Sequence, residues 1–160
     1  MIKLNEVINE NMVLLDLSVE NKEEVINKLV DIMDKEGKLS SRNEFLKSVL
    51  DREELLSTYC GSNIAIPHGI SDSVKEPGIC FARTKEIYWG SPKEEVHFVF
   101  LLAVPKSGNN KNSPHLKLLS AIAISSLEEG NREIWEKAET NEEILKSLRP
   151  AIKEIESDPE

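Results

Sequence analysis

The longest apolar run in the chain, VHFVFLLAVP at residues 96–105, limits most strongly what the chain can fold into. The run is too short to cross a membrane as a helix, which needs about 20 apolar residues. Its continuity is typical of a strand that is buried on both faces of a sheet. We therefore expect residues 96–104 to form a central strand of an α/β fold, with helices covering the sheet.

The segments on either side supply the other elements of such a fold. Ser18 or Asn21 can cap a first helix, and Ser41 with Glu44 has the spacing of a capping box for a second. In both segments apolar residues recur at helical spacing, whereas two later segments have strand character. We expect helices over residues 18–39, 40–56, 113–130, 131–140 and 141–156, and strands over 63–69 and 78–84.

Length, charge and cysteine content narrow the class of protein. The 160 residues are expected to form one domain over residues 1–150, with a helix end and a tail over 151–160. The formal net charge of −9 argues against nucleic acid or an anionic membrane as the main partner and is compatible with a protein partner that presents a positive patch. The N-terminal residues lack the pattern of a signal peptide, so we expect a cytoplasmic location. Cys60 and Cys80 are not in a CxxC pair and are expected to be unpaired thiols.

The segment NIAIPHGI, residues 63–70, contains the strongest candidate for chemistry. His68 follows an apolar run and Pro67, and it precedes Gly69. Proline fixes the backbone before the histidine, and glycine leaves room beside it. A neutral imidazole is a nucleophile near pH 7. His68 is therefore either a nucleophile at the end of a strand that Pro67 terminates, or an ordinary loop histidine.

The two other histidines have different surroundings. His97 lies within the central strand and is expected to be a sheet residue. His115 follows Pro114 at the start of a helix, where backbone N–H groups attract anions, although a solvated histidine is an equal interpretation. A zinc site from the three histidines lacks HExxH or paired-cysteine spacing, so we expect no metal. There is no GxxxxGK[ST] loop for a nucleotide, and we expect no cofactor.

Taken together, three stretches resemble the enzyme IIA domain of the bacterial sugar phosphotransferase system, of the fructose–mannitol type. They are REELLSTYCGSNIAIPHG, VHFVFLLAVP and HLKLLSAIA, and the resemblance extends from about Leu4 to about Leu148. It implies a three-layer α/β/α sandwich around a mixed sheet. It also implies a phosphotransferase component that accepts a phosphoryl group from phospho-HPr and passes it to a cysteine of a IIB component. The membrane IIC component would be an indirect partner, and this domain would not bind the sugar.

The resemblance also assigns roles to residues. The family's phosphorylated histidine corresponds to His68, its second active-site histidine to His115, and its active-site arginine to Arg52 of DREELL. The loop KSGNNKNSP before His115 is longer than in fructose-type members, and Pro114 replaces a glutamate often found there.

Further phosphoryl-binding candidates are Thr58, Ser62 and Gly69, although capping explains the two hydroxyls about as well. Gly69 would clear the approach of the two partner proteins. A regulatory IIA-like protein, which signals its phosphorylation state by binding other proteins, would carry the same residues and remains the alternative. The residues LLAVP and HLKLLS resemble those of fructose-type members more than those of mannitol-type members.

Overall fold

A computed structural model of the chain describes residues 4–106, 114–125, 128 and 130–157. The helical elements are α1 (Leu4–Val7), the 3-10 helix η1 (Glu10–Met12), α2 (Lys22–Lys35), α3 (Arg42–Leu55), α4 (Pro114–Ser125), α5 (Asn131–Lys137) and α6 (Asn141–Ser157). The strands are β1 (Val13–Leu17), β2 (Ile64–Ala65), β3 (His68–Ser71), β4 (Gly78–Tyr88) and β5 (Glu95–Pro105).

The five strands form one mixed sheet with β5 at its centre. The order is β1-β4-β5-β2, and β3 also pairs with β5. β4 and β5 are antiparallel, whereas β1 runs parallel to β4 and both β2 and β3 run parallel to β5. Every residue from Phe98 to Val104 is buried, which confirms the prediction that the apolar run is a central strand.

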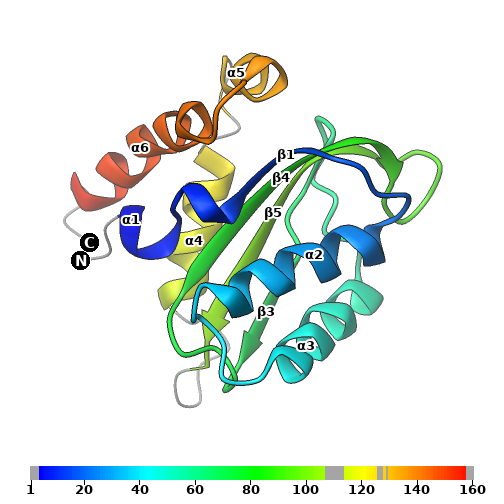
Figure 1. The fold of residues 1–160 in the computed structure, drawn as a ribbon, viewed down its shortest axis with the longest axis vertical. Coiled ribbons are helices and arrows are strands. Elements are labelled where there is room, and N and C mark those ends of the chain that lie inside the picture. Colours follow the sequence, from blue (N-terminus) through cyan, green and yellow to red (C-terminus); the bar gives the residue numbers. More distant parts are fainter. Residues whose placement is uncertain (1–3, 107–113, 126–127, 129, 158–160) are drawn as a thin grey trace.

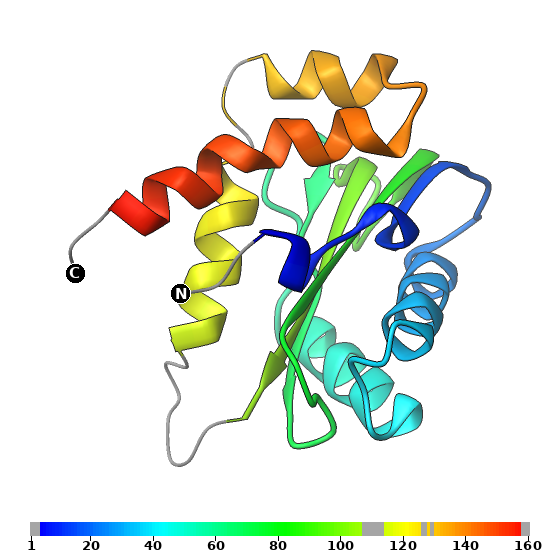
Figure 2. The same ribbon diagram turned by 60° about the vertical axis from the view of Figure 1, so that its left-hand side comes forward.

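Helices cover both faces of the sheet and make three layers (Figures 1 and 2). α2 and α3 lie on one face, and α4 lies on the other, with α6 packed against α4 and α5 against α6. On this second face the buried Trp135 ring contacts Phe81, Phe98 and Phe100 at centroid distances of 5.3–5.7 Å. The predicted α/β/α sandwich is therefore confirmed.

The predicted caps explain where the first two long helices begin. The Asn21 side chain accepts a hydrogen bond from Glu24 N at 3.0 Å, and Ser41 Oγ accepts one from Glu44 N at 3.3 Å. Each bond satisfies a backbone N–H that has no partner within its helix. Asn21, not Ser18, is the cap of α2.

The structure breaks the strand at Pro67, as predicted, but pairing with β5 does not stop there. Pro67 joins β2 to β3, and His68 is the first residue of β3, paired with Leu102 of β5. Proline cannot donate to a sheet, but its carbonyl can accept, and Pro67 O accepts from Leu102 N at 3.0 Å. His68 is thus held by the sheet on a strand and does not lie in a loop.

Candidate active site

The backbone around His68 determines which ring nitrogen can react. His68 Nδ1 lies 3.1 Å from the carbonyl oxygen of Ile66. A carbonyl oxygen can only accept, so Nδ1 carries the hydrogen and donates it. In the neutral ring the lone pair is then on Nε2. The half-buried His68 ring therefore presents Nε2 as its nucleophilic atom.

The surroundings of His68 keep the imidazole neutral. Burial lowers the pKa of His68 below its usual 6.5, because removal of water disfavours the charged ring, and the Arg52 charge lowers the pKa further. The Ile66 carbonyl and the Glu53 carboxylate act in the opposite direction, but they do not reverse the shift. At pH 7 the ring is in the form that can attack an electrophile.

His68 and Arg52 both line two open hollows. A hollow of about 480 Å³ is lined by Ser48, Asp51, Arg52, Leu55, His68 and Ile70. A second, of about 250 Å³, is lined by Arg52, Ser57, Thr58, Tyr59, Ile66, His68, Ser120 and Ile124. The sequence-predicted pair His68 and Arg52 is thus brought to one place from β3 and α3, and α4 contributes to the same site.

Arg52 lies in the last turn of α3, and its guanidinium has a backbone partner. Arg52 Nη1 donates to the carbonyl oxygen of Leu56 at 2.7 Å. A guanidinium has five N–H donors arranged as a planar fork that matches phosphoryl oxygens. Arg52 can therefore keep this backbone contact and still offer donors to an anion beside His68.

The structure places the hydroxyl candidates Thr58 and Ser62 differently. Thr58 lines the second hollow, but its hydroxyl donates to the buried carboxylate of Glu53. Ser62 is exposed in a turn, with a φ of 53°, and it lines neither hollow. Neither hydroxyl is positioned as an uncommitted donor next to His68.

Gly69 has a different role from the one that the sequence predicted. A Cβ atom at this position would lie 2.4 Å from Ser48 Oγ and 3.0 Å from both Phe45 Cε1 and Val49 Cγ2. All three atoms belong to α3. The missing side chain therefore allows α3 to approach β3, and it does not clear space for an approaching protein.

The second predicted histidine, His115, lies on α4, the helix that contributes to the second hollow. His115 is the second residue of α4, and its side chain lies outside the described residues. Ser120 and Ile124, farther along the same helix, do line the second hollow. Sequence reasoning missed these two residues and Ser48 and Asp51, because no local motif indicates which helix face meets a strand from elsewhere in the chain.

The third histidine and the two cysteines do not contribute to the site. His97 is half-buried, and its Nε2 lies 3.1 Å from Glu95 Oε1, with Glu86 close to both. It is therefore a sheet residue, as predicted. Cys60 is exposed and Cys80 is buried, and neither forms a disulfide. Full burial raises the pKa of the Cys80 thiol, and partial removal of water around Sγ raises the pKa of Cys60 although the residue as a whole is exposed.

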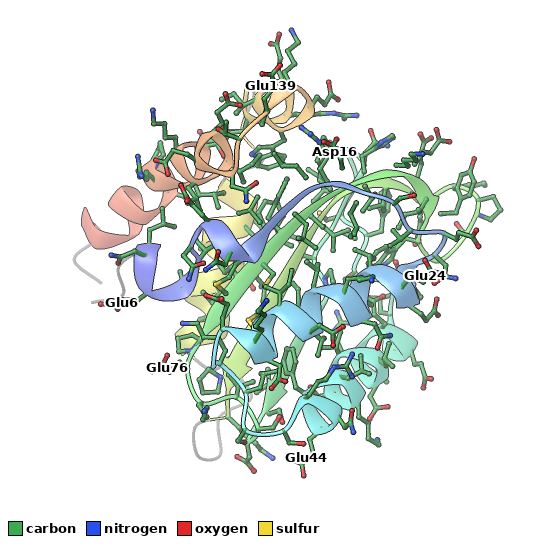
Figure 3. The ribbon with its side chains drawn as sticks, viewed as in Figure 1. Glu6, Asp16, Glu24, Glu44, Glu76 and Glu139 are labelled. Atoms are coloured by element: carbon green, nitrogen blue, oxygen red, sulfur yellow. The ribbon has the colours of Figure 1, made fainter. Side chains whose placement is uncertain are left out.

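Large apolar side chains are exposed at the hollows beside His68, and the acidic side chains labelled in Figure 3 lie at the periphery of the molecule. Leu55, Leu56 and Ile124 are 82%, 70% and 58% exposed, and Leu55 and Ile124 each line a hollow. Large apolar side chains exposed together mark a surface that binds another protein. Acidic side chains at the periphery belong to separate segments, as Figure 3 shows for Glu6, Asp16, Glu24, Glu44, Glu76 and Glu139.

Comparison with known sequences identifies the class. Residues 6–150 match the family described as phosphoenolpyruvate-dependent sugar phosphotransferase system, EIIA 2. The chain is 33% identical over 145 residues to the fructose-specific EIIABC component of Bacillus subtilis, covering 89% of this chain and 22% of that protein. It is 36% identical over 145 residues to the mannitol-specific enzyme IIA component of Geobacillus stearothermophilus, covering 89% and 94% respectively.

Solved structures share the fold. The nitrogen regulatory protein IIA-Ntr from Neisseria meningitidis superimposes with a TM-score of 0.78 at 28% identity, covering 91% of this chain and 98% of that one. The IIA mannitol structure from Escherichia coli superimposes with a TM-score of 0.72 at 24% identity, covering 88% and 98%. A matched α/β/α sandwich and a matched sequence over most of the chain define a phosphotransferase component. The chain belongs to the EIIA 2 family of the phosphoenolpyruvate-dependent sugar phosphotransferase system.

Some of the relatives differ from this chain in length. The chain spans 22% and 23% of the length of two multi-component relatives, the fructose-specific one and the 2-O-alpha-mannosyl-D-glycerate-specific EIIABC component of Escherichia coli. Among the described residues, no helix has both the length and the hydropathy needed to span a membrane.

Proposed function

We propose that the chain is a phosphocarrier for sugar uptake, in which Nε2 of His68 accepts a phosphoryl group from phospho-HPr and passes it to a cysteine of a IIB component. The observation that carries the proposal is the hydrogen bond from His68 Nδ1 to Ile66 O, which fixes Nε2 as the basic atom of a ring beside Arg52. Family membership supports the reaction, and a solved IIA–IIB complex of the mannitol system from Escherichia coli supports the acceptor class.

The proposed transfer balances without a metal or a nucleotide. The lone pair of Nε2 forms a bond to phosphorus while the nitrogen–phosphorus bond of phospho-HPr breaks, and its electron pair returns to the HPr imidazole. Nδ1 keeps its hydrogen throughout. In the second step a IIB thiolate forms a sulfur–phosphorus bond, and the pair of the breaking bond returns to Nε2. The first step exchanges one nitrogen–phosphorus bond for another of similar energy, and in both steps the protein contributes positioning and charge stabilisation.

Arg52 and His115 are the proposed helpers. The Arg52 guanidinium neutralises charge on the phosphoryl oxygens. His115 opens α4, the helix that also supplies Ser120 and Ile124 to the second hollow. The exposed Leu55, Leu56 and Ile124 form the contact surface for both partner proteins. The IIC component remains an indirect partner, located beyond IIB.

The relatives favour transport over the regulatory alternative. The matched family is described as a component of the sugar phosphotransferase system, and the curated relatives that match at 33% and 36% identity are fructose- and mannitol-specific. The proposed sugar class is accordingly of the fructose–mannitol type. We place the protein in the cytoplasm, where phospho-HPr is available.

The test is phosphorylation with phosphoenolpyruvate, enzyme I and HPr, followed by phosphorus NMR of the labelled protein. We expect one acid-labile phosphoryl group on Nε2 of a histidine, lost in His68→Ala and retained in His97→Ala, which removes another half-buried histidine. Addition of IIB should then discharge the label. Label at a ring Nδ1, label that resists acid, or label that survives in His68→Ala contradicts the proposal.

A further inference from the structure

Glu53 is a buried carboxylate that the proposed transfer does not use directly. It follows Arg52 in the last turn of α3, and its side chain is only 2% exposed. A buried carboxylate is costly unless donors surround it. Glu53 Oε1 accepts from the Thr58 hydroxyl, and Oε2 accepts from Thr58 N at 3.4 Å and from Trp89 Nε1 at 3.1 Å. The Lys22 ammonium lies 3.9 Å from Oε2. The carboxylate thus joins α2, the end of β4 and the segment after α3.

The hydrogen bonds of that segment lead from Glu53 to both reactive groups. The carbonyl of Thr58 accepts from Ile66 N at 3.0 Å, and the carbonyl of Ile66 accepts from His68 Nδ1 at 3.1 Å. Two residues before Thr58, the carbonyl of Leu56 accepts from Arg52 Nη1 at 2.7 Å. Glu53 therefore holds a residue, Thr58, whose carbonyl anchors Ile66, the residue that selects the His68 tautomer. Thr58 also lies two residues from Leu56, whose carbonyl holds the Arg52 guanidinium.

We propose that Glu53 is a positioning residue for phosphoryl transfer, acting through Thr58 on the orientation of both His68 and Arg52. The inference rests on the proposed function of His68. Glu53 forms no hydrogen bond with the His68 ring. It fixes Thr58 by two hydrogen bonds, one from the side chain and one from the backbone of Thr58. The geometry of a transfer site must hold within a fraction of an ångström, because a displacement of about 1 Å can cost about 100-fold in rate.

A purely structural role predicts something different. A buried charge network that only stabilises the fold changes the free energy of unfolding when it is broken, but it leaves the chemistry of a folded variant unchanged. The positioning role predicts that breaking the contacts of Glu53 in a folded variant leaves the His68 ring in two tautomers instead of one. The Glu53 charge also raises the pKa of His68, against the effect of Arg52, so its removal should lower that pKa further.

The test uses Glu53→Gln in the full chain. The amide has the shape of the carboxylate but no charge and a single acceptor oxygen, so it cannot accept from the Thr58 hydroxyl on one atom and from Thr58 N and Trp89 Nε1 on the other. We expect two His68 tautomers, seen as new ring nitrogen signals in proton–nitrogen NMR of the unphosphorylated protein, together with a lower His68 pKa. Phosphorylation by phospho-HPr should slow by about 10- to 100-fold.

Three further variants make the result decisive. Thr58→Val removes the hydroxyl donor at nearly constant shape, and it should change the His68 tautomer and the transfer rate as Glu53→Gln does. The double variant should be no worse than either single variant, because both break one link. Ser147→Ala is the control: it removes the acceptor of Trp135 Nε1, a buried tryptophan hydrogen bond of 2.9 Å on the other face of the sheet. It should lower stability and leave the His68 tautomer and the rate unchanged.

The two proposals fail in different ways. A wild-type protein that takes no label from phospho-HPr on His68 refutes the proposed function. A folded Glu53→Gln protein with one His68 tautomer and a wild-type rate refutes the positioning role alone. If Glu53→Gln does not fold, Thr58→Val decides by the same two measurements.

Discussion

Substitution of Gly69 by alanine tests whether the close packing of α3 on β3 sets the distance between Arg52 and His68. The added Cβ would lie 2.4 Å from Ser48 Oγ, whereas ordinary contact begins at 3.4 Å, so unless Ser48 rotates, α3 and β3 must separate by about 1 Å. Ser48 cannot rotate away at no cost, since its Oγ donates to Phe45 O at 2.7 Å. Two more side-chain atoms of α3 lie at 3.0 Å, a few tenths of an ångström inside ordinary contact, so rotation of Ser48 alone does not relieve the overlap.

We expect Gly69→Ala to lower the free energy of unfolding by about 1–3 kcal/mol, the usual cost of overpacking. Because Arg52 lies on α3 and His68 on β3, the same displacement should slow phosphorylation by about 100-fold. The assays are guanidinium unfolding and single-turnover transfer from phospho-HPr, at a temperature where every variant is folded.

The matched control is Gly78→Ala, another buried glycine in the same sheet. Its Cβ would lie 2.7 Å from Met33 Sδ, part of a flexible side chain of α2, so stability should fall without moving α3. Adding Ser48→Ala to Gly69→Ala should recover part of the rate. A folded Gly69→Ala protein that transfers at the wild-type rate would refute the reasoning.

Four further predictions concern single groups. Burial and Arg52 lower the pKa of His68, so its NMR titration midpoint should fall below 6.5. Since the unfolded chain binds this proton more tightly, stability should decrease as pH falls from 6.5 to the folded pKa; a midpoint at or above 6.5 contradicts this. Arg52→Ala should slow phosphorylation at least about tenfold and leave the melting temperature within a few degrees, in contrast to a structural arginine. Leu55→Asp, at an 82% exposed position, should weaken binding of HPr and IIB in titration calorimetry without changing stability, and unchanged affinities would exclude the apolar surface. His115→Ala should load from phospho-HPr but discharge poorly to IIB in a two-stage label assay, and wild-type rates in both stages would remove His115 from the site.

The parts of the fold that follow from local sequence were predicted well. β5 could be recognised because its apolar residues are contiguous, and α2 and α3 because Asn21 and Ser41 satisfy their first N–H groups. β1 was missed. Its five residues, VLLDL, carry no strong alternation, and the parallel partner that makes them a strand lies more than 60 residues farther along, in β4.

The site was predictable only in part, for the same physical reason. The motif around His68 and the arginine of DREELL are local, whereas the roles of Gly69 and Glu53 depend on contacts between separate elements. Gly69 reads as a spacer for an approaching protein until α3 is seen beside it. Glu53 reads as a surface charge until Trp89, 36 residues away, donates to it.

The presence of His68 and Arg52 in the lining of both hollows has a kinetic consequence. Both residues line both hollows, so a protein that reaches His68 from either side covers the same two side chains. With the proposed function, donor and acceptor compete for one surface and no ternary complex forms. The chain then turns over by a ping-pong scheme, with parallel lines in double-reciprocal plots and inhibition when either partner is in excess. Dissociation of the first partner becomes an obligatory step of every cycle, which favours weak, short-lived complexes over tight ones.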